Sequence, residues 1–117
     1  MKEENVLCAA SAYDRKYYFN NRFSMLPEQV QDELHIACVV FTDDVGGYIS
    51  MFFEDDGTLM IDTGCDEGDY LYDEIGAGLL SRKMQREKQE LFEQLELFYR
   101  VCILKQDIDR INDENAG

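Results

Sequence analysis

Two runs of strand-forming residues separated by a short glycine-containing loop constrain the fold more than any other feature. Residues 48–54 and 58–63 are rich in aromatic, β-branched and other apolar side chains, and Asp55-Asp56-Gly57 divides them. This arrangement is typical of an antiparallel β-hairpin. A hairpin needs further structure to cover its apolar face. The chain must therefore supply helices or more strands against it.

The length of the loop decides which side chains share a face of the hairpin. A three-residue loop that ends in a left-handed glycine places Phe53 opposite Leu59 and Met51 opposite Ile61, and Ile49 extends the same apolar surface. A two-residue loop would mix apolar and polar residues on both faces. We therefore predict the longer loop. The opposite face then carries Tyr48, Ser50, Phe52, Glu54, Thr58, Met60 and Asp62.

Apolar residues at helical spacing flank the hairpin on both sides. A helix is predicted from Pro27 to about Thr42, with Pro27 in its first turn. A second helical region is predicted from 69 to 105, with an interruption near Gly76 or Gly78. Its apolar stripe is wide, which is typical of a helix that faces a core. The stripe comprises Leu91, Phe92, Leu95, Phe98, Tyr99, Cys102 and Ile103.

The first 23 residues support two interpretations. Dense aromatic residues favour a strand over 16–20 that joins the hairpin as a third strand, whereas a helix over 9–18 fits almost as well. Together these elements predict an α+β fold. In it, an antiparallel hairpin or three-stranded sheet packs against a mid-chain helix and a long C-terminal helix. We expect one domain over 1–105 and a polar C-terminal tail over 106–117, because 117 residues suit a single core.

The acidic charge of the chain is concentrated in its middle. The formal net charge is −14, and residues 23–81 contain fourteen Asp and Glu and no Lys or Arg. A field of that sign disfavours nucleic acids and anionic membranes and favours a basic protein or a cation. The alternative is that the charge only confers solubility. The charged N-terminus and the lack of a long apolar run predict a cytoplasmic protein.

The cysteine and histidine content limits metal and redox chemistry. The four cysteines form no C-x-x-C pair, so neither a zinc ribbon nor a thioredoxin-type site is encoded. We expect reduced thiols, with Cys38 and Cys102 on apolar helix faces and Cys65 in an exposed loop. His35 is the only histidine, which excludes sites that need two. It is expected at the edge of the mid-chain helix.

Asp43 and Asp44 are weak candidates for a cation site. If the mid-chain helix continues to a cap at Gly46-Gly47, both carboxylates lie at its negative end, where they are unfavourable. If the helix ends by Thr42, they lie in a solvated turn. A cation site would need further oxygen ligands, for which Asp73 and Glu74 are the weak candidates.

Asp62-Thr63-Gly64 resembles the strand-ending motif of retroviral-type aspartic proteases. Those enzymes are almost wholly β and bring two such loops together across a dimer. Here a helical region follows the motif, and the predicted register places Asp62 opposite Ser50 on the half-polar face. We therefore expect Asp62 to be structural or solvated, and we identify no catalytic residue.

Several short strings resemble a known family. KYYFN (16–20), LP (26–27), FTDDVGG (41–47) and YDEIG (72–76) are similar to segments of a group of small acidic proteins of anaerobic Firmicutes, classed as a domain of unknown function. The resemblance covers most of residues 6–105. It implies a cytoplasmic bacterial protein and supplies no activity, cofactor or site residue.

The leading functional hypothesis is a non-enzymatic interaction or regulatory module with a protein partner, basic in character. A homodimer is also plausible, because a small sheet and two helices leave apolar surface uncovered. Two alternatives come from other classes. One is a binder of a divalent cation or small ligand through Asp43 and Asp44. The other is an acidic mimic of nucleic acid that occupies a basic protein. No cofactor is expected.

Overall fold

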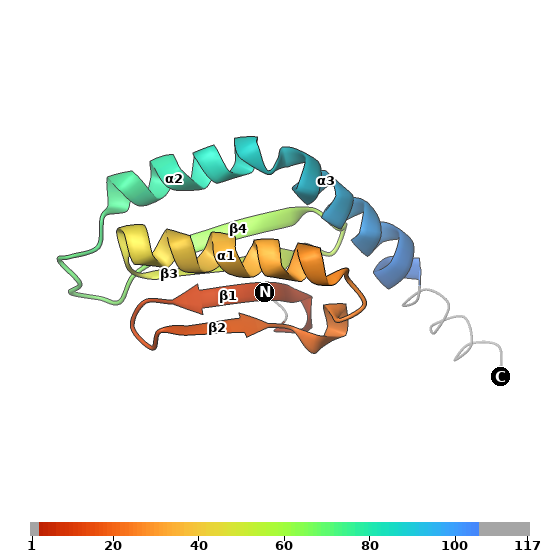
Figure 1. The fold of residues 1–117 in the computed structure, drawn as a ribbon, viewed down its shortest axis with the longest axis horizontal. Coiled ribbons are helices and arrows are strands. Elements are labelled where there is room, and N and C mark those ends of the chain that lie inside the picture. The colour runs from red at the N-terminus through yellow and green to blue at the C-terminus, as the bar shows by residue number, and fades with distance from the viewer. Residues whose placement is uncertain (1–2, 106–117) are drawn as a thin grey trace.

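The protein is an α+β domain built on a four-stranded antiparallel sheet, as seen in a computed structural model that describes residues 3–105 (Figure 1). The strand order across the sheet is β2-β1-β3-β4. The strands are β1 (Val6–Ser11), β2 (Lys16–Phe19), β3 (Tyr48–Phe53) and β4 (Leu59–Gly64). The predicted fold class is confirmed, but the sheet has four strands rather than two or three.

The β3–β4 hairpin has the predicted register. Phe53 pairs with Leu59 and Met51 with Ile61, and Gly57 has a φ of 90° in the loop. Ser50 pairs with Asp62, so Asp62 lies on the half-polar face as expected. This register buries one face of β3 completely, because its alternate side chains point to the same side of the sheet.

The N-terminal segment confirms the strand predicted over 16–20, which is β2, and adds a strand that was not predicted. The helix over 9–18 is wrong, and the strand over 16–20 is joined by an additional strand, β1, that lies between β2 and β3. The register of β1 on β3 shifts between Val6 and Cys8. This bulge lets the neighbouring Leu7 and Cys8 both become buried. Small residues such as Ala10 suit this central position because α1 packs directly over it.

Three α-helices follow the order predicted from the apolar periodicity, with different boundaries. They are α1 (Glu28–Val45), α2 (Glu74–Glu87) and α3 (Gln89–Phe98), and α3 continues as a π-helical segment, Tyr99–Leu104. Short 3-10 turns occupy Glu3–Asn5 and Asn21–Phe23. The expected helix over 69–105 instead begins at Glu74 and is broken at Lys88, not at a glycine.

The three helices lie on one side of the sheet (Figure 1). α1 covers β1, β2 and β3, while α2 and α3 cover β4 and α2 also packs on α1. In residues 3–105, no helix is long and apolar enough to cross a membrane. The predicted tail over 106–117 lies outside the described residues. The largest fully buried side chains are Phe23, Phe41, Phe53, Leu7, Leu34, Ile49, Met51, Leu95, Ile103, Cys8 and Cys38.

An aromatic stack joins the C-terminal helix to the sheet. The rings of Phe53 and Tyr99 lie 4.4 Å apart, and the Tyr99 hydroxyl donates a hydrogen bond of 3.1 Å to Asn5 Oδ1. Tyr99 belongs to a buried row with Leu95 and Ile103, one helical turn apart. Phe98, predicted to lie at the centre of the apolar stripe, is only partly buried. The apolar stripe therefore faces the core through Leu95, Tyr99 and Ile103.

The turn between α1 and β3 depends on two glycines with positive φ. Gly46 (φ 81°) follows the last residue of α1, and Gly47 (φ 67°) leads into β3. A Cβ on Gly47 would collide with the carbonyl oxygen of Gly64, whereas the space around Gly46 is open. The turn therefore tolerates a side chain better at Gly46 than at Gly47.

Gly46→Ala and Gly47→Ala test this difference. We expect Gly46→Ala to lower the free energy of unfolding by about 1–3 kcal/mol, because a φ of 81° with a ψ of −165° lies in a region almost confined to glycine. Gly47→Ala adds a backbone collision and should cost more. Urea denaturation of both variants measures the difference. Equal losses would show that the approach of Gly47 to β4 is unimportant for stability.

Leu95→Ala tests the position of α3. Leu95 is 2% exposed, so its truncation should leave a cavity and lower the free energy of unfolding by about 2–5 kcal/mol. Leu97→Ala is the matched control on the same helix, because Leu97 is 61% exposed. It should change stability by less than about 0.5 kcal/mol. Similar losses in the two variants would contradict the observed orientation of α3.

Candidate functional site

The outer surface of α1 carries apolar residues that the core does not use. The buried side of the helix is formed by residues such as Leu34, Cys38 and Phe41. Ile36 and Val40 lie outside this stripe and are 63% and 56% exposed. They are four residues apart, so they project from the same side of the helix, one turn from each other. These two exposed β-branched side chains together form a small apolar patch on α1.

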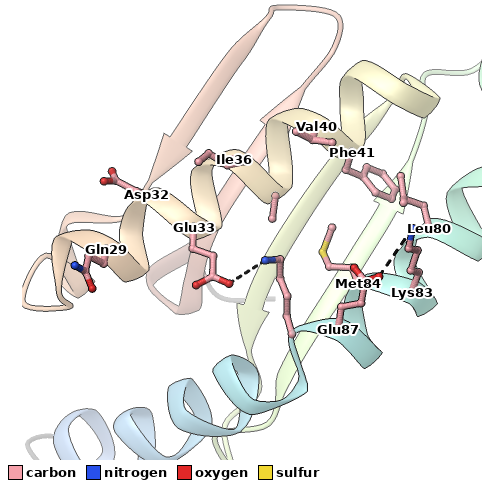
Figure 2. A pocket seen from close by; sticks show the side chains of 12 residues that line it. Gln29, Asp32, Glu33, Ile36, Val40, Phe41, Leu80, Lys83, Met84 and Glu87 are labelled. Atoms are coloured by element: carbon pink, nitrogen blue, oxygen red, sulfur yellow. Dashed lines mark hydrogen bonds and ion pairs between the residues drawn. The ribbon is translucent and has the colours of Figure 1, made fainter.

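A groove between α1 and α2 connects this surface to the core (Figure 2). Its volume is about 560 Å³. Ile36, Val40 and Phe41 line it from α1, and Leu80 and Met84 line it from α2. We call it the interhelix groove. Its polar margin comprises Gln29, Asp32, Glu33, Lys83, Glu87 and Lys88.

The cations of the groove already have anionic partners. Lys88, at the break between α2 and α3, places its Nζ 2.9 Å from Glu33 Oε1 on α1 (Figure 2). The Lys83 Nζ lies 3.9 Å from Glu87 Oε1 on α2. Within residues 3–105, the Asp32 carboxylate has neither an ion-pair nor a hydrogen-bond partner. The groove therefore presents an apolar floor and an unpaired negative charge.

The structure places Asp43 and Asp44 at the unfavourable end of α1. The helix runs on to Val45, so the alternative in which it ends by Thr42 is wrong. α1 contains five acidic residues and no Lys or Arg. Acidic side chains in a last helical turn are each unfavourable by about 0.3–1 kcal/mol at low ionic strength. These two positions therefore oppose local stability.

Asp73 comes near this end of α1 through its backbone. Its amide donates a hydrogen bond of 3.2 Å to the carbonyl of Val45, while its side chain accepts one of 2.8 Å from the Gly76 amide at the start of α2. Asp73 thus acts as the N-cap of α2.

Over the described part of the chain, no group of three or more His, Cys, Asp or Glu side chains is placed to hold a metal ion.

His35 and two buried thiols surround Tyr17 on β2. The imidazole of His35, which is exposed, stacks on the Tyr17 ring at 4.1 Å. The Sγ atoms of the buried Cys8 and Cys38 are 3.8 Å apart. Their mutual hydrogen bond and burial raise the pKa of the Cys8 thiol, which makes it a poor nucleophile. Burial also raises the pKa of the Tyr17 hydroxyl.

The β4–α2 loop is held in place yet exposes two bulky side chains. The Tyr13 hydroxyl donates a hydrogen bond of 2.5 Å to Asp69 Oδ2 and accepts one of 2.9 Å from the Asp66 amide. The bond to Asp69 raises the pKa of Tyr13 to about 12 and lowers that of Asp69. Tyr70 and Leu71 are 96% and 94% exposed.

The apolar periodicity of the sequence predicted α1 but not the groove beside it. Ile36 and Val40 lie one helical turn apart, outside the buried stripe of α1. An apolar pair in that position was the sequence signal that could have indicated the groove. The α2 wall could not be found in this way, because Leu80 and Met84 are far from α1 in the chain and meet it only in the folded protein. Asp62, by contrast, lies where predicted, exposed on β4.

Comparisons with known proteins identify a family and no activity. A search of curated proteins found no match, and neither did a search of solved structures. The model of the "Family of unknown function (DUF6145)" matches residues 4–107. The match includes all the strands and helices described above. The chain therefore belongs to this family of unknown function.

Proposed function

We propose that the protein is a non-enzymatic interaction module that binds an amphipathic helix of a basic partner protein in the interhelix groove. One observation carries the proposal. Ile36 and Val40 stand exposed above an apolar groove between two helices. An amphipathic helix docked between two helices is a recurring mode of recognition, in which its apolar residues at helical spacing fill such a groove.

A partner helix in the groove would remove apolar surface from water. Burial of apolar surface is favourable by about 25 cal/mol per Å². Ile36, Val40 and Leu80 are not fully buried in the free protein. Their burial under a partner would therefore contribute to the free energy of binding without any change in the core. A partner recognised by charge alone, as in nucleic-acid mimicry, would leave this surface unused.

The charges near the groove favour a basic partner. Both lysines at its margin are engaged with glutamates, and Asp32 is left unpaired within residues 3–105. No Lys or Arg occurs from 23 to 81, which includes all of α1. A second copy of this chain fits less well, because it brings the same net charge of −14. Lys or Arg on the partner helix would complement the α1 side of the groove.

The cytoplasm is the proposed setting of this interaction. Cys8 and Cys38 lie close together as free thiols, which suits a reducing compartment.

Two model helices of equal length test the proposal. Both carry the same apolar face, and the polar face is rich in Lys in one and in Glu in the other. Titration into the ¹⁵N-labelled protein should give chemical-shift changes at α1 and α2 for the Lys-rich helix and much weaker binding for the Glu-rich one. Ile36→Ser should weaken binding about tenfold, corresponding to ~1.4 kcal/mol for one aliphatic side chain.

Leu97→Ser is the matched control, because Leu97 is 61% exposed and does not line the groove. It should leave binding unchanged. Equal binding of the two helices, or shift changes away from α1 and α2, would overturn the proposal. A dimer in sedimentation equilibrium that Ile36→Ser dissociates would do the same, since the occupant would then be a second copy.

A further inference from the structure

A second pocket lies on the other flank of α1, against the turn between β1 and β2. Its volume is about 550 Å³, and no residue that lines it also lines the interhelix groove. Ser11, Arg15 and Lys16 line it from the β1–β2 hairpin, and His35 and Asp43 line it from α1. We call it the hairpin pocket. Its size is in the range of small-molecule sites.

The hairpin side of the pocket is cationic. Arg15 and Lys16 both line the cavity, and within residues 3–105 neither has an ion-pair partner. Two adjacent unpaired cations are unexpected in a chain with 25 acidic and 11 basic residues. Arg15 also has a φ of 52°, the one non-glycine residue with positive φ among those described. Arg15 is the last residue of the β1–β2 turn, where a left-handed residue is common.

The helix side of the pocket is anionic. Asp43 lines the cavity from the last turn of α1, where the helix dipole adds partial negative charge. No basic residue of α1 offsets it. A cation bound at this end would be stabilised by the carboxylate and by the helix end together. The neighbouring Asp44 does not line the pocket.

Thr42, Tyr17 and His35 also line the pocket. The Thr42 hydroxyl is engaged with the carbonyls of Cys38 and Val39 at 3.3 and 3.2 Å. The ring of His35 is stacked on Tyr17 at 4.1 Å. The pocket thus has a cationic edge, an anionic edge and a wall formed by stacked rings.

We propose that the hairpin pocket binds a small zwitterion of the amino-acid class, with its carboxylate at Arg15 and Lys16 and its ammonium at Asp43. A simple anion would meet Asp43 and the net charge of −14. A hard metal ion needs several oxygen ligands, of which the pocket offers one carboxylate. A molecule that carries both charges satisfies both edges.

Four probes test the charge requirement: L-leucine and 5-aminopentanoate carry both charges, whereas butyrate and butylamine carry one each. The single histidine of the chain provides one imidazole NMR signal within the pocket, and thermal melting gives an independent readout. At equal ionic strength, one zwitterion should shift the His35 signal and raise the melting temperature. Butyrate and butylamine should do neither. A comparison of the responses to L-leucine and 5-aminopentanoate shows whether the pocket binds an α-amino acid or one with more widely separated charges.

Asp43→Asn and Asp44→Asn form a matched pair, because adjacent carboxylates differ in whether they line the pocket. Asp43→Asn should weaken binding of the effective zwitterion at least tenfold, and Asp44→Asn should leave it within about twofold, as Asp44 acts only through screened charge. Arg15→Gly removes the guanidinium without disfavouring the positive φ, and it should also weaken binding at least tenfold.

Three results would overturn the proposal. The first is the absence of any change in the His35 signal or the melting temperature with either zwitterion. The second is an equal response to butyrate or butylamine, which would indicate a site for a single charge. The third is an equal loss of binding in Asp43→Asn and Asp44→Asn. None of these results bears on the interhelix groove, because the two cavities share no lining residue.

Discussion

The fold depends on the alternation of side chains along β3. Ile49, Met51 and Phe53 are almost fully buried on one face, and β3 pairs with β1 on one side and β4 on the other. Because the side-chain period of a strand is two, this register assigns every neighbouring residue to a face. The opposite face carries Asp62 and other polar residues. All three helices must therefore cover the same side of the sheet.

The two proposed sites follow from this one-sided arrangement. α1 lies over the middle of the sheet, and α2 and α3 lie beside it over β4, so α1 has a seam on each flank. The interhelix groove occupies the seam with α2, and the hairpin pocket occupies the seam with the β1–β2 hairpin. The first is mainly apolar and the second is charged at two edges. The difference between these linings favours a macromolecular partner in one and a small molecule in the other.

The sequence was sufficient to predict elements whose signals are local. The β3–β4 register follows from alternation of residues around Gly57, and α1 follows from its periodicity. β1 was missed because Cys8, Ala9 and Ala10 are small and carry little strand preference, and it is stabilised by pairing on both sides. The break at Lys88 was also missed. No proline or glycine marks it, and packing of α3 on Phe53 through Tyr99 accompanies it.

The candidate sites were less predictable than the fold, since both join residues far apart in the chain. The Asp43 carboxylate was singled out because it opposes the helix dipole, but its position across the pocket from Arg15 requires the β1–β2 hairpin. Likewise, Ile36 and Val40 become the side of a groove only when α2 packs against α1.

Site-specific photo-crosslinking in the native host tests most directly whether the groove is the interaction surface. A benzoylphenylalanine would replace Ile36 in one variant and Leu97 in another, since these positions are 63% and 61% exposed. We expect a crosslinked product from position 36, joined to a Lys- or Arg-rich helical segment of another protein, and none from position 97. A product from position 97 alone, or one that joins position 36 to a second copy of this chain, would contradict it.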